Sequence, residues 1–154
     1  AYPNERMIAF LFLPRNFVPP FQTMIYFPSA WAADGASFSE YVNTSGSIDY
    51  IVKNGRAVMF PIYKTTFERK DDSYRCAGSN ETHQYTECMV KCVKDFSRSV
   101  DYLETRLDID TTRLGYFGHS WGARMGAIIP AIEDRLKLSI LINGGLSKIK
   151  KFEL

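Results

Sequence analysis

The sequence Gly-His-Ser-Trp-Gly at residues 118–122 constrains this chain more than any other feature. It follows a short apolar run, 113–117, and it begins a segment rich in Gly and Ala, 121–129. The apolar run predicts a buried strand, and the small residues favour a helix packed closely on a sheet. The pattern therefore predicts a strand, a sharp turn and a helix, with the hydroxyl of Ser120 exposed at the turn.

Gly118 and Gly122 show why the turn needs glycine. A side chain at either position would clash, because the strand and the helix approach each other closely there. Ser120 would then lie at the N-terminal end of the helix, where the positive end of the helix dipole stabilises a developing negative charge. A hydroxyl held there is suited to attack a carbonyl carbon. The alternative, an ordinary strand-to-helix turn with an incidental serine, stays open.

Other segments alternate between strand and helix patterns. Apolar runs predict four further strands, at residues 6–13, 22–27, 57–63 and 136–143. Apolar residues recur every three or four positions through 88–107, including Leu107, and predict a long helix. A short helix is expected at 48–54. The alternation predicts an α/β fold with a mostly parallel sheet and flanking helices, in a single domain over residues 1–154.

Several polar positions directly follow predicted strands. In a parallel sheet the ligand lies at the carboxyl ends of the strands. Ser29 and Ala30 follow 22–27, and Lys64 follows 57–63. We therefore expect these residues to share one rim with Ser120. The segments that begin at Trp31 and Lys64 are predicted to shape a substrate pocket.

The polar segment after Lys64 leaves two interpretations open. Glu68 and Arg69, with Lys64, are candidates to meet a polar substrate. A solvated loop is the alternative, because charged loop residues usually face water.

Charge and composition limit the classes of partner. The formal net charge is +2, from 19 basic and 17 acidic residues. This balance gives no support for nucleic acid or an anionic membrane as a partner. The longest apolar runs are far too short to cross a bilayer. The expected ligand is a small molecule, and neither a cofactor nor a metal is expected.

Cys76, Cys88 and Cys92 have neither a zinc-binding nor a Cys-x-x-Cys spacing. Cys88 and Cys92 would share one face of the predicted helix. A metal would need more ligands, and His83 is the one further candidate nearby. We interpret the three residues as reduced, inert thiols, which favours a reducing compartment such as the cytoplasm.

The chain resembles the α/β-hydrolase superfamily, and three segments carry the likeness: 61–69, 94–110 and 115–123. The closer likeness is to the dienelactone-hydrolase and prolyl-oligopeptidase-like branch, and closer still to hydrolase domains fused to bacterial serine/threonine kinases. The resemblance implies Ser120 as nucleophile. It also implies two oxyanion donors, the backbone N–H of Trp121 and that of Ala30 or Ser29. Dienelactone hydrolases usually carry Cys at the nucleophile position, so Ser120 points to esterase-like relatives.

The histidines depart from the pattern of that superfamily. Its chain order is Ser, then Asp or Glu, then His, and the last two would follow the strand at 136–143. His83 and His119 are the two histidines here, and both precede Ser120. Side chains of neighbouring residues diverge at such a turn, so His119 is poorly placed as a base, and a loop histidine such as His83 is more often solvated. We therefore expect a truncated α/β-hydrolase fold that lacks the triad acid and histidine.

The leading functional hypothesis is a serine hydrolase for a small-molecule ester, inactive or incomplete as these 154 residues. Two alternatives stay open: a non-catalytic scaffold with the hydrolase fold, and an interaction module attached to a kinase. Without later strands, residues 136–143 would form an exposed apolar edge. That edge predicts self-association, with the tail at 148–154 crossing to a neighbour.

Overall fold

The computed structural model describes residues 2, 5–35, 37–44, 46–71, 73–77 and 82–144. Its centre is a five-stranded sheet in the order β1-β3-β2-β4-β5. The strands are β1 Ala9–Phe12, β2 Phe21–Phe27, β3 Ala57–Pro61, β4 Ile109–His119 and β5 Leu136–Ile142. β1 runs antiparallel to β3, and the other neighbours are parallel. The mostly parallel sheet expected from the sequence is confirmed.

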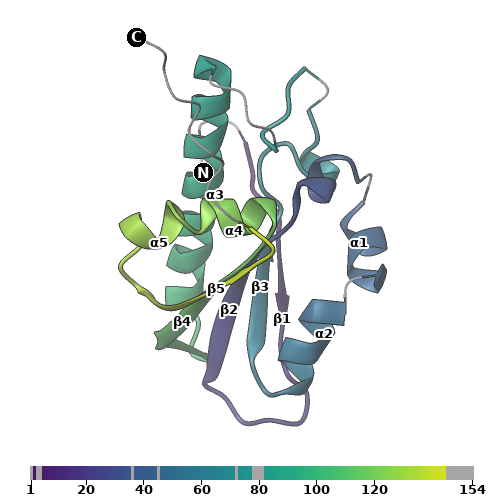
Figure 1. Ribbon diagram of the computed structural model, residues 1–154. Coiled ribbons are helices and arrows are strands. Elements are labelled where there is room, and N and C mark those ends of the chain that lie inside the picture. The colour runs from purple at the N-terminus through teal and green to yellow at the C-terminus, as the bar shows by residue number, and fades with distance from the viewer. Residues whose placement is uncertain are drawn as a thin grey trace.

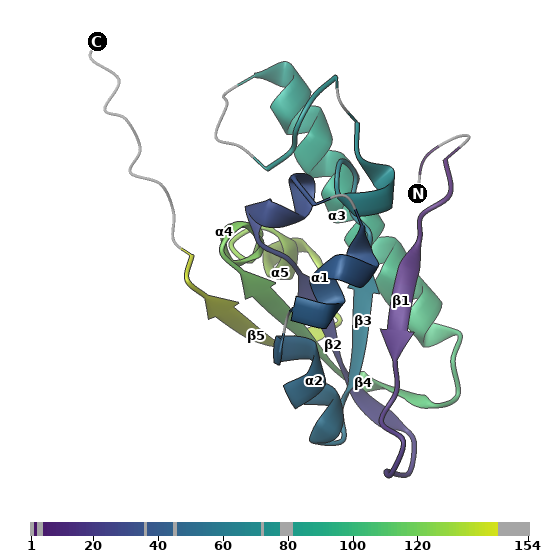
Figure 2. The same cartoon turned by 90° about the vertical axis from the view of Figure 1, so that its right-hand side faces the viewer.

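Helices cover both faces of the sheet (Figure 1). One face carries α1 Phe38–Thr44 and α2 Gly46–Lys53. The opposite face carries α3 His83–Glu104, α4 Trp121–Met125 and α5 Ile129–Ile132. Figure 2 shows α1 and α2 in front of the strands, with α3 behind them. Two short 3₁₀ helices, η1 Ala30–Ala33 and η2 Phe67–Arg69, follow β2 and β3.

Each face of the sheet has its own apolar core. Neighbouring residues of one strand point to opposite faces, so Ile25 packs on the α3 side while Met24 packs on the α1 side. The near-continuous burial of β2 and β3 explains why these strands are apolar at almost every position.

α3 differs from its predicted bounds at both ends. It begins at His83, because the side chain of Thr82 accepts a hydrogen bond from the Tyr85 N–H at 3.1 Å and caps the first turn. It ends at Glu104, so Leu107 lies beyond the helix and is fully exposed. The inclusion of Leu107 in the buried stripe was wrong, since the helix that would have turned it inward has already ended.

The single helix expected over 121–129 is divided. α4 ends at Met125, with Gly126 as its C-cap, and α5 begins at Ile129. Pro130 lies in the first turn of α5, where proline's missing N–H costs no hydrogen bond. A proline at that position favours a new helix start over continuation of the earlier helix.

Cys76 and Cys88 form a disulfide, so their interpretation as reduced thiols was wrong. Their Cα atoms are 5.5 Å apart, within the range that a disulfide requires. The spacing gave no sign of the pair, because only the fold returns the segment around Cys76 to α3. Cys92 is a free, buried thiol, and burial raises its pKa. The argument from thiols for a reducing compartment therefore no longer stands.

β5 is the least buried strand of the sheet. Leu138 is 54% exposed, Ile140 37% and Leu141 48%. Self-association through this strand stays a prediction, and the tail at 148–154 lies outside the described residues. Among the helices of the described part, none combines the length and apolarity that a membrane span needs.

Candidate active site

Ser120 lies at the turn between β4 and α4 with backbone angles of φ 52° and ψ −103°. Residues other than glycine rarely adopt such a positive φ, which costs on the order of 1–3 kcal/mol. The expected strained turn is therefore confirmed. The residue is half-buried, and its hydroxyl makes no capping hydrogen bond to α4.

The two glycines of the motif lie where side chains do not fit. A Cβ on Gly118 would come within 2.5 Å of the Gly122 carbonyl oxygen. A Cβ on Gly122 would collide with the carbonyl oxygen of Phe27 in β2. The crowding expected from the sequence is confirmed, and its cause is the close approach of α4 to β2 and β4.

Strand order brings the end of β2 beside the turn. β2 and β4 are neighbours, with Phe27 opposite Gly118. The Gly122 N–H donates to the Pro28 carbonyl at 3.0 Å and ties the start of α4 to the segment after β2. On the other side, the Ser120 N–H donates to the Ile142 carbonyl at 2.8 Å. Ser120 is therefore held between the ends of β2 and β5.

A cavity of about 230 Å³ opens at this turn. Its lining comes from the ends of β2 and β5, the loop before α3, and α4, and comprises Ala30, Ala77, Ser120, Trp121, Arg124, Asn143 and Gly144. Three of the predicted site residues thus come together: Ser120, Trp121 and Ala30. Ser29 and Trp31 are not among the lining residues, and Trp31 is 48% exposed beside Tyr41.

The backbone N–H groups of Trp121 and Ala30 are suited to bind a ligand oxygen. Trp121 is the first residue of α4, where helix geometry supplies no internal acceptor. Among the described residues, no backbone hydrogen bond uses the Trp121 or the Ala30 amide as donor. Their assignment as oxyanion donors remains a prediction.

Neither histidine lines the cavity. The His83 side chain is 89% exposed, and its Nδ1 lies 3.7 Å from Glu87 Oε1. His119 is the last residue of β4 and is half-buried. Within the ranges that the structure describes, no group of three His, Cys, Asp or Glu side chains is arranged to hold a metal ion.

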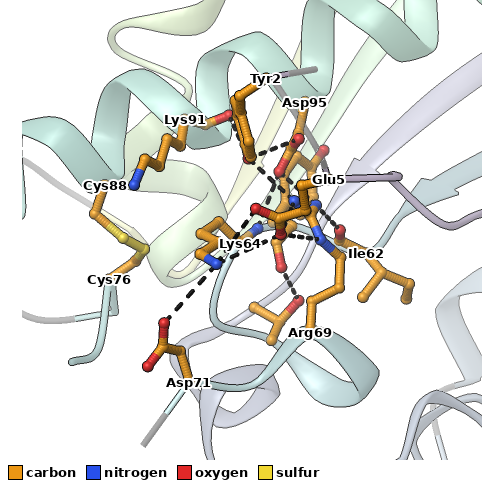
Figure 3. Close-up of polar contacts among 12 residues, drawn as sticks. Tyr2, Glu5, Ile62, Lys64, Arg69, Asp71, Cys76, Cys88, Lys91 and Asp95 are labelled. Carbon is orange, nitrogen blue, oxygen red and sulfur yellow. Dashed lines mark hydrogen bonds and ion pairs between the residues drawn. A yellow bond between two sulfur atoms is a disulfide. The ribbon is translucent and has the colours of Figure 1, made fainter. Parts of the chain in front are cut away.

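Lys64 belongs to a different polar cluster, shown in Figure 3. Its Nζ lies 3.4 Å from Glu5 Oε1 and 3.8 Å from Asp71 Oδ2. Its backbone N–H donates to Asp95 Oδ2 at 3.0 Å. The structure therefore does not bring Lys64 to the Ser120 cavity, although both residues follow strands of the same sheet.

Arg69 is the centre of that cluster, which we call the Arg69 network: Tyr2, Glu5, Lys64, Arg69 and Asp95. Arg69 Nη1 donates to Asp95 Oδ2 at 2.7 Å, and Nη2 donates to Glu5 Oε1 at 2.9 Å. Tyr2 donates to Asp95 Oδ1 at 2.9 Å. Burial raises the pKa of Asp95, and the positive charge of Arg69 opposes that shift. The network joins the N-terminal segment, the loop after β3 and α3.

The solvated interpretation of the loop after Lys64 was wrong for Arg69, while Glu68 is exposed and also makes one structural hydrogen bond. Arg69 is 8% exposed and bound to Asp95. Glu68 Oε1 accepts a hydrogen bond from the Phe38 N–H at 2.8 Å, at the start of α1. These side chains hold the fold together, because they bridge segments far apart in the sequence.

Four lining residues were missed by the sequence analysis: Ala77, Arg124, Asn143 and Gly144. A signal existed for Arg124, since residues four apart share one side of a helix and Arg124 follows Ser120 by four. Ala77, Asn143 and Gly144 reach the cavity through tertiary folding, and no local pattern distinguishes them.

Comparisons with known proteins support the hydrolase fold. No protein-family model matches the chain. The α/β-hydrolase domain-containing protein WAV2 of Arabidopsis thaliana is 35% identical over 72 residues, which are 46% of this chain and 22% of that protein. The chain therefore spans well under two thirds of this relative's length.

Solved esterases share the fold at low sequence identity. Est1E from Butyrivibrio proteoclasticus, with ferulic acid bound, has a TM-score of 0.65 and 17% identity, over 90% of this chain and 49% of that one. A glucuronoyl esterase from Solibacter usitatus has a TM-score of 0.61 and 17% identity, over 90% and 43%. An acetyl xylan esterase from Paenibacillus sp. R4 has a TM-score of 0.62 and 14% identity, over 92% and 46%.

Two of these neighbours are named as esterases, and the chain spans less than half of each of the three. Attachment to a kinase, which the sequence resemblance suggested, stays a prediction. The sheet order, the strained serine turn and these similarities lead to one conclusion: the chain has the α/β-hydrolase fold and is related to the α/β-hydrolase superfamily.

Proposed function

We propose that Ser120 is the nucleophile of a serine hydrolase that acts on esters. The observation that carries this proposal is the strained turn at Ser120, which lines a cavity together with Trp121 and Ala30. Strain of this kind persists where the surrounding structure enforces it, and it clusters at active sites. The esterases with the same fold support the same class of reaction.

In the proposed reaction the Ser120 oxygen attacks the ester carbonyl and loses its proton to a base. The N–H groups of Trp121 and Ala30 stabilise the resulting oxyanion. Collapse of the intermediate releases the alcohol, which takes up the proton, and leaves an acyl-serine. Water activated by the same base then releases the acid and restores Ser120.

The base and its acid partner are proposed to come from outside these 154 residues. Neither His83 nor His119 lines the cavity, and the chain spans less than half of each of the solved structures with this fold. A serine hydroxyl without an adjacent base is a weak nucleophile at neutral pH. The chain by itself is therefore proposed to be inactive or nearly so.

The test compares p-nitrophenyl acetate hydrolysis by these 154 residues and by a longer protein from the same gene. The longer protein is expected to lose on the order of a thousandfold or more in kcat on Ser120→Ala. The shorter chain is expected to remain near the rate in buffer, with little change on Ser120→Ala or His83→Ala.

Two results would contradict the proposal. Unchanged activity of the longer Ser120→Ala variant would exclude Ser120 as nucleophile. Strong turnover by the shorter chain, abolished by Ser120→Ala, would place the base within this chain, and His83→Ala would then be the next variant to measure.

A second candidate function is non-catalytic: an interaction module that associates through β5. The exposed apolar side chains of this edge strand favour it, since unpaired strand edges add further strands. We expect concentration-dependent association in light scattering, weakened by Leu138→Lys. A monomer at all concentrations, for both the parent chain and the variant, would exclude a role through this strand.

A further inference from the structure

A second cavity, which we call the α2 groove, lies between α2 and the end of β1. Its volume is about 560 Å³, within the range of about 300–1,000 Å³ that is usual for small-molecule sites. β1 runs antiparallel to β3, with Phe12 opposite Val58 near the start of that strand. The end of β1 therefore lies at the opposite edge of the sheet from the turn that follows β4, as Figure 2 shows.

The walls of the α2 groove are largely apolar. The apolar side chains that line it are Leu11, Phe12, Leu13, Phe17 and Val52. Phe17 is 48% exposed, and the other four are half-buried. The ring of Phe17 packs directly on Gly55, where an added Cβ would approach it to 2.7 Å, so this wall has a defined position. Apolar surface that is still open to water is stabilised when an apolar ligand covers it.

Arg15 is the unpaired charge of the α2 groove. The charged side chains that line it are Arg15, Asp49 and Lys53. Lys53 Nζ lies 2.8 Å from Asp49 Oδ2, so these two side chains balance each other. Within the described ranges, no hydrogen bond or ion pair engages the side chain of Arg15. The groove therefore presents one net positive charge beside its apolar walls.

This combination favours a ligand that has an apolar tail and one anionic group. The planar guanidinium of Arg15 can form paired, charge-assisted hydrogen bonds with a carboxylate. A cationic ligand with the same tail would meet like charge at the same place. No hydroxyl, thiol or imidazole side chain is among the described residues that line the groove. Its composition is therefore suited to binding and lacks the usual nucleophiles of hydrolases.

We propose that the α2 groove binds amphipathic carboxylates, such as medium-chain fatty acid anions. Arg15 pairs with the carboxylate, and the hydrocarbon tail lies against Phe12, Phe17 and Val52. The ligand is bound there without being converted. The site is separate from the Ser120 cavity, and the proposal does not depend on the reaction proposed for Ser120.

Binding of ligands that share one tail and differ in charge tests the proposal. The chain, labelled with ¹⁵N, is titrated with octanoate, 1-octanol and octylammonium, and dissociation constants come from the amide shifts of Val52 and Gly55. Octanoate is expected to bind about fivefold more tightly than 1-octanol, the gain from an ion pair at a solvent-exposed arginine. Octylammonium should bind more weakly than 1-octanol. The amides of Gly118 and Gly122 should not shift at the same concentrations.

Two variants, a matched control and a salt series locate the effect. Arg15→Gln is expected to bring octanoate within about twofold of 1-octanol, while Phe17→Ser weakens both ligands. Arg56→Gln removes an exposed arginine that follows α2 and does not line the groove, and it leaves the preference unchanged. Added sodium chloride weakens octanoate binding and leaves 1-octanol binding unchanged, a readout that needs no substitution.

Several results would each overturn the proposal: no measurable octanoate binding, equal affinities for octanoate and 1-octanol, or a preference that survives Arg15→Gln. Octanoate shifts confined to Gly118 and Gly122 would also overturn it, because they would place the acid in the Ser120 cavity. Loss of activity on Ser120→Ala, or its absence in the longer protein, bears on the proposed function alone and leaves this test unchanged.

Discussion

The Arg69 network and the Ser120 cavity both follow strands of the same mostly parallel sheet, and they differ in how their polar groups are paired. In the network, Arg69, Asp95 and Tyr2 donate to or accept from one another within a buried cluster. Among the residues that line the cavity, Trp121 and Ala30 have backbone amides that donate no backbone hydrogen bond within the described part of the chain. Buried polar groups are nearly always paired, so the first arrangement serves stability and the second is suited to a ligand.

The comparison also predicts which changes each region tolerates. Removal of one partner from the Arg69 network should lower the free energy of unfolding, because a charge is left buried without its counter-ion. Addition of a Cβ atom at Gly118 or Gly122 should lower the stability of the Ser120 turn, because the backbone segments there are already in contact. Four predictions test this difference, in order of decreasing expected change.

Arg69→Met should lower the free energy of unfolding by about 3–5 kcal/mol, since it leaves the carboxylate of Asp95 buried without its cation. Urea unfolding measures the loss. The double variant Arg69→Met/Asp95→Leu should recover much of it, because it leaves no charge behind. A loss below about 1 kcal/mol in the single variant would mean that the network contributes little to stability.

Gly122→Ala should cost about 1–3 kcal/mol, because the added methyl group meets the Phe27 carbonyl and pushes α4 away from β2. Gly46→Ala is the matched control, since a Cβ there meets nothing within 4 Å. The control should be neutral or stabilising by up to about 1 kcal/mol. Equal effects at the two positions, measured by thermal unfolding, would disprove the crowding at the turn.

Ser120→Gly should raise the free energy of unfolding by about 1 kcal/mol, because glycine adopts the positive φ of 52° without strain. Ser120→Ala keeps the Cβ and should change stability by less than about 0.5 kcal/mol. Denaturant midpoints for the two variants check this. A destabilised glycine variant would show that the serine contributes contacts that outweigh its backbone strain.

Glu5→Gln should have the smallest effect, under about 1 kcal/mol at pH 7, since the side chain is partly exposed. Burial raises the pKa of Glu5. Hydrogen bonds and positive charge from Arg69 and Lys64 lower it by more, so the pKa of Glu5 lies below the ordinary 4.5. A carboxyl with a lowered pKa stabilises the fold above about pH 4.5, and that contribution disappears as the pH falls through the lowered value.

Unfolding measured from pH 7 to pH 3 should therefore show parent and Glu5→Gln chains converging at acid pH. A constant difference across this range would mean that Glu5 acts through packing and not through its charge.

Those parts of the fold that depend on local pattern could be predicted from the residues alone. Glycine spacing around Ser120 predicted the strained turn, because only glycine fits where the strand and the helix touch. Apolar runs predicted the five strands of the sheet, and apolar periodicity predicted most of α3. These signals are readable because hydrophobic spacing follows the repeat of each element.

The tertiary structure alone decided which of these elements meet. Ala30 reaches Ser120 because β2 lies beside β4, and strand order has no local signal. Cys76 pairs with Cys88, and Arg69 with Asp95, because the loop after β3 folds back onto α3. Lys64 followed a strand as a site residue would, yet its neighbours made it part of the network. Spacing along a chain cannot distinguish a charged residue that binds a ligand from one that is paired within the protein. The pairing depends on segments that are distant in the sequence.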